Sequence, residues 1–179
     1  ASPAGPEPPD ARVEAVVTAS TAELDLAEAD RVLGVGAGLG DERFVALAAA
    51  VATAMDLCLG ATRVVTDHGW LPVERQIGTT GVEIRPRIYV ALGISGAVQH
   101  VAGLGDPDHV VSVNLDGSCP MAAMAELNLV ADARAVLIAL ADRLGVPVDP
   151  DLRATLGGGA VPASASPAPA SPAPTEEHP

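Results

Sequence analysis

Residues 88–100 read IYVALGISGAVQH and combine a strand, a turn and the start of a helix. The apolar run Ile88–Leu92 is typical of a strand buried on both faces. Ser95 is a good helix N-cap, so we predict a helix over 95–101 whose first amides are left uncovered by small residues. Such a turn suits an anion, above all a pyrophosphate. His100 shares a helix face with Gly96, so it either reaches a ligand across this turn or is an interior histidine with internal partners.

The same alternation of strands and helices continues on both sides of this stretch. Further strands are predicted over 31–35, 57–61, 109–113 and 127–130, with one of uncertain membership over 12–18. Helices are predicted over 41–55, 121–126 and 132–144 from apolar residues at helical spacing. This order predicts an α/β fold: a Rossmann-like three-layer domain with a mainly parallel sheet and helices on both faces. Ligands of such sheets bind outside the carboxyl ends of the strands.

Polar residues gather at these strand ends. Thr62 and Arg63 follow one strand, and Asn114 and Asp116 follow another. Between them lies the stretch 62–87, which has little periodicity and is expected to be a long loop; such loops are usually functional. These groups are therefore expected to converge on a ligand.

The glycines of the stretch 34–40 (GVGAGLG) do not form the dinucleotide fingerprint G-x-G-x-x-G. Leu39 or Asp41 stands where the third glycine belongs. A flexible strand-to-helix turn and a phosphate-facing loop are both compatible with this motif.

The composition excludes several classes of function. The 179 residues carry a net charge of −13, and all ten basic residues are arginine, which argues against a nucleic-acid partner. No apolar run approaches the roughly 18 residues of a membrane span, so we expect no membrane insertion. Cys58 and Cys119 are too few for a disulfide framework or a zinc site, and they indicate reduced thiols in a cytoplasmic protein.

Both ends of the chain are of low complexity. Residues 1–10 are rich in proline, and residues 157–179 are rich in proline and alanine. Such segments bury little apolar surface, so we predict that both are disordered and that residues 11–156 form one domain.

Three motifs together point to a family. TRVVTDHGWLPVERQIGTTG (62–81), GISGAVQHVAG (93–103) and VNLDGSCP (113–120) resemble the FAD-binding domain of electron transfer flavoprotein alpha subunits. The resemblance covers about residues 12–144, with the order and spacing of the motifs preserved. It implies FAD as the cofactor.

The resemblance also implies roles for single residues. Arg63 would lie near the flavin ring, Thr80 at the flavin N5 edge, and His100 at the C2 carbonyl. Asn114 would contact the adenosine-phosphate part, and Glu126 would lie near the adenosine. The implied cofactor-binding set is Thr62, Arg63, Gln76, Gly78, Thr79, Thr80, Gly81, Ser95, Gly96, Ala97, Gln99, His100, Asn114, Asp116 and Glu126.

Departures from the family pattern suggest a divergent branch. Ala37 stands where the family usually has arginine, Thr79 where it has glutamine, and Leu115 where lysine is common. Glu126 replaces the usual aspartate. These changes concern the redox potential and the choice of partner more than FAD binding.

The function implied is that of an electron carrier, not an enzyme, with no catalytic residue and no metal site. Its partners would be an electron transfer flavoprotein beta subunit that completes the site, a donor dehydrogenase and an acceptor oxidoreductase. Two alternatives stay open: a nucleotide-binding structural or interaction domain without a redox flavin, and an NAD-dependent enzyme domain.

Overall fold

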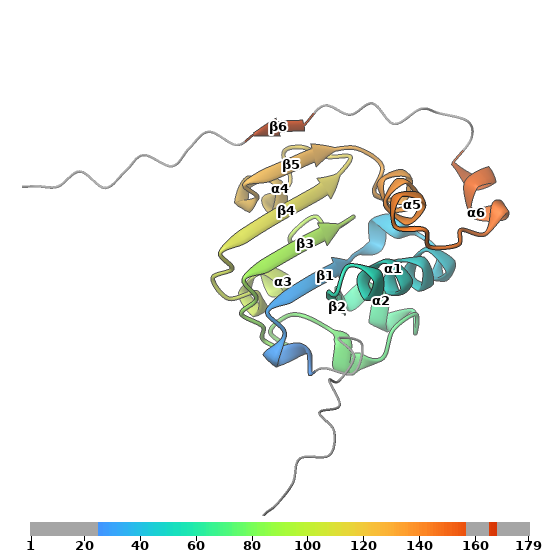
Figure 1. Cartoon of the computed structure of the whole chain (residues 1–179). Coiled ribbons are helices and arrows are strands. Elements are labelled where there is room, and N and C mark those ends of the chain that lie inside the picture. The colour runs from blue at the N-terminus through green and yellow to red at the C-terminus, as the bar shows by residue number, and fades with distance from the viewer. Residues whose placement is uncertain (1–24, 157–164, 168–179) are drawn as a thin grey trace, which may run out of the picture.

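The described part of the chain is built on one twisted sheet (Figure 1). The computed structural model describes residues 25–156 and 165–167. The strands lie in the order β2-β1-β3-β4-β5-β6; the first five are parallel, and β6 runs antiparallel to β5. The bounds are β1 Arg31–Val35, β2 Cys58–Ala61, β3 Ile88–Leu92, β4 His109–Asn114, β5 Leu127–Val130 and β6 Ala165–Pro167. The predicted mainly parallel sheet is confirmed.

Helices cover both faces of this sheet, as predicted. The longer ones, α1 and α5, lie on one face with α2 and α6 nearby, and the short α3 and α4 lie on the other (Figure 1). Their bounds are α1 Glu42–Ala54, α2 Arg63–Asp67, α3 Val98–Gly103, α4 Pro120–Met124, α5 Ala133–Leu144 and α6 Pro150–Thr155. Asp41 and Asp132 start α1 and α5, because their side chains accept hydrogen bonds from amides two residues on, at 2.8 and 2.9 Å.

Each face of the sheet has its own apolar core. Phe44 and Leu137 belong to the core under α1 and α5, and Tyr89 and Met121 to the core under α3 and α4. The ring of Tyr89 lies over Gly34 of the neighbouring strand, where a Cβ atom would overlap the Tyr89 hydroxyl. Gly34 is therefore a packing requirement for a buried tyrosine.

Several element predictions need correction. The stretch 62–87 contains α2 and a 3-10 helix, Val73–Arg75, where a loop was expected, and α6 was not predicted. The helix predicted over 95–101 is α3, which begins at Val98 with Ala97 as its N-cap. Ser95 does not cap it, because Gly96 has a φ of +85° and the chain there does not turn into a helix.

The predicted segments at the ends are only partly covered by the structure. The expected strand over 12–18 and the N-terminal segment 1–10 lie outside the described residues. Within the predicted C-terminal tail, residues 165–167 form β6 along the edge of β5. The proposed domain and tail boundaries stay predictions.

Candidate functional site

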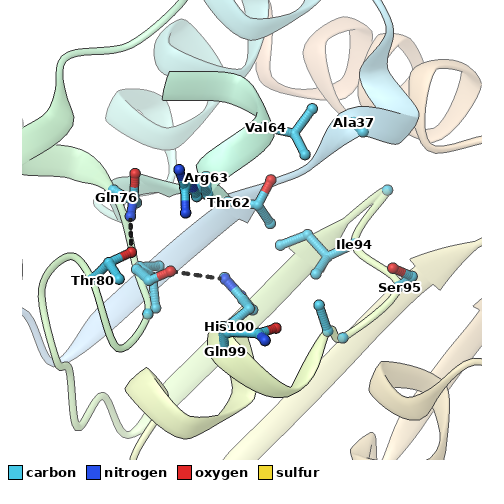
Figure 2. A pocket seen from close by; sticks show the side chains of 15 residues that line it. Ala37, Thr62, Arg63, Val64, Gln76, Thr80, Ile94, Ser95, Gln99 and His100 are labelled. Atoms are coloured by element: carbon cyan, nitrogen blue, oxygen red, sulfur yellow. Dashed lines mark hydrogen bonds between the residues drawn. The ribbon is translucent and has the colours of Figure 1, made fainter. Parts of the chain in front are cut away.

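A pocket of about 350 Å³ opens outside the carboxyl ends of β1, β2 and β3 (Figure 2). This is the edge at which parallel α/β sheets bind ligands. The volume lies at the lower end of the roughly 300–1,000 Å³ of small-molecule sites, so a ligand larger than a drug-sized molecule would extend over its rim. The lining residues are Ala37, Thr62, Arg63, Val64, Gln76, Ile77, Gly78, Thr80, Gly93, Ile94, Ser95, Gly96, Ala97, Gln99 and His100.

Thr62 follows β2 and lines the pocket, and its hydroxyl is unused within the described residues. Its Oγ1 atom is buried and has no hydrogen-bond partner among the described residues. It also makes no capping bond to α2, although Thr62 is the N-cap residue of that helix. A buried hydroxyl without a partner costs free energy, and Thr62 Oγ1 is the one such atom that belongs to a residue of the pocket lining.

Arg63 is the one arginine in the lining of this pocket. Its Nε atom pairs with Asp67 Oδ2 at 3.3 Å along α2, and the side chain is 68% exposed. An exposed pair of this kind holds the side chain only weakly, so the guanidinium can be shared with an anionic ligand.

Residues 76–81 form a loop beside α2, and Gln76 fixes its shape. The Gln76 side chain accepts a hydrogen bond from Thr66 Oγ1 at 2.8 Å and donates one to Thr80 Oγ1 at 2.9 Å. Thr79 and Gly81 are not among the lining residues. Thr79 donates its amide to Gln99 O at 3.0 Å, and a Cβ on Gly81 would overlap the backbone of Gln76.

The turn between β3 and α3 carries the amides expected of an anion site. Within the described residues, none of the amides of 95–99 donates a hydrogen bond to the protein. The turn is held from outside by Asn114 Nδ2, which donates to Ile94 O at 3.0 Å, and by the Met121 amide, which donates to Ser95 O at 3.1 Å. The amides are thus fixed in place and still available.

The predicted residues beyond this turn do not line the pocket. Asn114 supports the turn, and Asp116 accepts hydrogen bonds from Ser118, which lower the pKa of the Asp116 carboxyl. Glu126 directly precedes β5 and pairs with His109 Nδ1 at 2.9 Å at the start of β4. Glu126 therefore lies at the amino edge of the sheet, opposite the pocket.

His100 lines the pocket, but its polar atoms are engaged within the protein. The residue is 5% exposed; Nε2 lies 2.8 Å from the Tyr89 hydroxyl and Nδ1 lies 3.2 Å from Ile77 O. Burial lowers the pKa of His100, although the bond to Ile77 opposes this shift. Of the two interpretations of this histidine, the structure shows the one with internal partners.

The glycine stretch 34–40 is a packing element. Gly36 N donates to Leu92 O and Gly38 N to Gly93 O, both at 3.0 Å, so these amides are not open to a phosphate. A Cβ at either glycine would overlap the backbone of Gly93. Of this stretch only Ala37 reaches the pocket lining.

Sequence reasoning missed the apolar part of the lining. Gly93 and Ile94 directly follow β3, so the strand-end rule would have found them, and Ala37 likewise follows β1. No sequence pattern marked Val64 or Ile77 as lining residues. Val64 lies in α2, which was not predicted, and Ile77 lies in the stretch that was expected to be a loop.

Two other site types receive no support from the described part of the chain. Residues 25–156 hold no cluster of histidine, cysteine and acidic side chains suited to a metal ion. No helix in that range has the length and apolar character required to cross a membrane.

Comparison with known proteins decides the family. The family model described as "Electron transfer flavoprotein FAD-binding domain" matches residues 25–105. The chain is 39% identical to the electron transfer flavoprotein subunit alpha of Chromohalobacter salexigens, over 69% of this chain and 29% of the relative. It is 40% identical to protein FixB of Rhizobium meliloti, over 70% of this chain and 36% of the relative.

This chain carries a domain of the electron transfer flavoprotein alpha-subunit family. A third relative is the acryloyl-CoA reductase electron transfer subunit beta of Anaerotignum propionicum, 39% identical over 61% of this chain and 30% of the relative. The chain thus spans about a third of the length of these curated relatives. All the pocket-lining residues of this alpha-type domain lie within the matched range, and all but Ala37 lie between Thr62 and His100.

Proposed function

We propose that this alpha-type domain binds FAD in the pocket and works as an electron carrier without a substrate reaction of its own. The observation that carries the proposal is the row of open amides in the turn at 95–99, most of whose residues line the same pocket as Thr62 and Arg63. A hydroxyl and a row of amides are what the ribityl and pyrophosphate groups of a dinucleotide can use.

The residues present fit part of such a cofactor. Ser95, Gly96 and Ala97 would hold the pyrophosphate through their amides, and Gly96 could not carry a Cβ without approaching Met121 N to 2.6 Å. Thr62, Arg63 and Thr80 would hold and orient the flavin end. FAD itself supplies the exchange of electrons when bound, and the protein supplies binding, orientation and electrostatics.

Arg63 carries the permanent charge of the pocket lining, so its effect on the redox potential of a bound flavin should be measurable. A cation beside the flavin favours its reduced, more negative form, and one contact worth about 1.4 kcal/mol corresponds to about 59 mV for a one-electron couple. The Arg63 side chain is largely exposed and already pairs with Asp67. We therefore expect it to change the potential by at most this amount.

The pocket volume of about 350 Å³ is small for a whole dinucleotide, and this supports a second protein in the complete site. We propose an electron transfer flavoprotein beta subunit as that partner, with a donor dehydrogenase on one side and an acceptor oxidoreductase on the other. Binding of FAD by this chain alone is then expected to be weak.

Co-expression with a candidate beta subunit tests the proposal. A purified complex with a flavin absorption band that bleaches on reduction supports the carrier. A colourless complex that stays colourless after incubation with FAD contradicts it and favours a structural domain. NAD-dependent turnover without flavin favours the enzyme alternative. The structure gives that alternative little support, because the amides of Gly36 and Gly38 are already hydrogen-bonded within the protein and are not open to a phosphate.

A further inference from the structure

The outer edge of β5 is a part of the fold that the proposed cofactor site does not use. The pocket lies at β1, β2 and β3, whereas β5 (Leu127–Val130) lies on the far side of β4 and carries no charged side chain. Leu127 and Val130 are 38% and 43% exposed. Native proteins protect such edges with charges, prolines or a covering segment, because free strand amides and carbonyls pair with other chains. Since β5 has no charge of its own, its protection depends on a cover.

The surface next to this edge is apolar as well. Leu115 follows β4 and is 70% exposed. The loop that holds it lies against β5, since a Cβ on Gly117 would approach Val130 Cγ2 to 2.8 Å. A strand added to β5 would therefore meet apolar side chains on the strand itself and on the neighbouring loop, which favours association.

The cover comes from the tail of the same chain (Figure 1). Three antiparallel residue pairs join β5 to β6: Leu127 with Pro167, Asn128 with Ser166, and Leu129 with Ala165. Residues 163–166 (ASAS) are the longest run without proline in the stretch 162–174, so this part of the tail offers the most consecutive amides. Pro167 has no N–H to donate, and a strand that ends in proline is a poor template for a further strand.

We propose that β6 is a removable cover: residues 165–167 occupy the edge of β5 and keep a second copy of this chain from pairing there. A ladder of three residue pairs that ends in a proline is weak, since isolated two-stranded hairpins are at best marginally stable in water. The cover can therefore exchange with a competing strand. This inference goes beyond the proposed function and does not involve FAD.

A second copy of the chain is the competitor that fits the geometry of β5. β6 shows that the edge accepts an antiparallel strand, and two β5 strands related by a two-fold axis are antiparallel as well. In the register that β6 uses, this axis would pass through Asn128, so the two Asn128 side chains would lie opposite each other. Asn128 Oδ1 is buried and has no partner among the described residues, and the side-chain amide of the second copy would be a donor for it.

Hydrogen exchange of the β5 amides in the 179-residue chain tests the cover. Ala165→Pro with Ser166→Pro places a proline ring where one of the two β6 amides must face β5. The matched control is Ala170→Pro with Ser171→Pro, because residues 170–172 repeat the Ala-Ser-Pro sequence of β6 farther along the tail. The β5 amides that do not pair with β4 should exchange between about two- and tenfold faster in the first variant only, the worth of one hydrogen bond. Equal exchange in wild type and both variants would overturn the proposal.

Sedimentation velocity over a series of concentrations tests what the cover prevents. Wild type and the control should stay monomeric at concentrations where Ala165→Pro/Ser166→Pro forms a reversible dimer. Adding Leu127→Lys to that variant should restore the monomer, because a lysine blunts an exposed strand edge. Adding Leu144→Lys instead should not, since Leu144 is similarly exposed, at 40%, but lies at the end of α5. A monomer at every concentration, or a dimer that persists with Leu127→Lys, would refute the role of β6 as a cover against a second copy.

Discussion

Gly96 is the residue at which the fold and the proposed site can be tested together. It lies in the turn between β3 and α3 with a φ of +85°, and a Cβ there would lie 2.6 Å from Met121 N. That amide donates to Ser95 O, so alanine at position 96 must displace the bond that holds the turn. Gly96→Ala should therefore destabilise the protein and move the amides of residues 95–99.

The magnitude follows from three contributions. A residue with a Cβ in the left-handed region costs about 1–2 kcal/mol. Overpacking against α4 adds about 1–3 kcal/mol, and the displaced Met121 hydrogen bond adds about 0.5–1.5 kcal/mol. Gly145→Ala is the matched control, because Gly145 has a φ of +71° with nothing within 4 Å and lies at the end of α5.

Urea denaturation of both variants measures the difference. Gly145→Ala should lower the free energy of unfolding only by the cost of the backbone strain. Gly96→Ala should lower it by about 1.5–4.5 kcal/mol more. FAD affinity should fall for Gly96→Ala and stay near wild type for Gly145→Ala. Equal destabilisation of the two variants, with unchanged FAD affinity, would refute this account of the turn.

Three further predictions concern the wall of the pocket and the core behind it. Thr62→Val should leave the stability without cofactor unchanged or higher and should weaken FAD binding by between about two- and tenfold in a fluorescence titration; a stability loss with normal affinity would contradict it. Gly34→Ala should cost about 1–3 kcal/mol in urea denaturation by overpacking against Tyr89, and combining it with Tyr89→Phe should recover part of the loss; no recovery would contradict the packing argument. The pKa of His100 is lowered in the fold, so the unfolded state binds the proton first, and stability should fall as pH falls from about 6.5 toward the folded pKa. His100→Gln should lack this slope, and the same slope in both proteins would contradict the assignment.

The sequence predicted the sheet well because its central strands are largely buried and read as apolar runs. Ile88–Leu92 and His109–Asn114 are short apolar runs between turn residues, which is the strongest strand signal available. The sequence missed α2, because a helix of five residues with Val65 as its single buried residue leaves no periodic pattern. It also placed the start of α3 too early, because Ser95 is a good cap only where the backbone that follows is helical.

The sequence predicted the part of the candidate site that lies at the carboxyl ends of the strands. It did not predict the part that depends on contacts between distant residues. Thr62, Arg63 and the turn at 95–97 all line one pocket, as the strand-end rule predicts. Glu126 was assigned by resemblance alone and lies at the opposite edge, beside His109. The engagement of His100 depends on Tyr89, and no local pattern could show that contact.

The most direct test of the central claim is NMR of the ¹⁵N-labelled 179-residue chain during titration with FAD. Because fast-exchanging weak binding is still visible by this method, it does not require the beta subunit. We predict progressive shifts of the amide signals of residues 95–99 and of Thr62, with His109 and Glu126 at the amino edge unaffected. No shifts at saturating FAD, or shifts centred on the amino edge, would contradict the account.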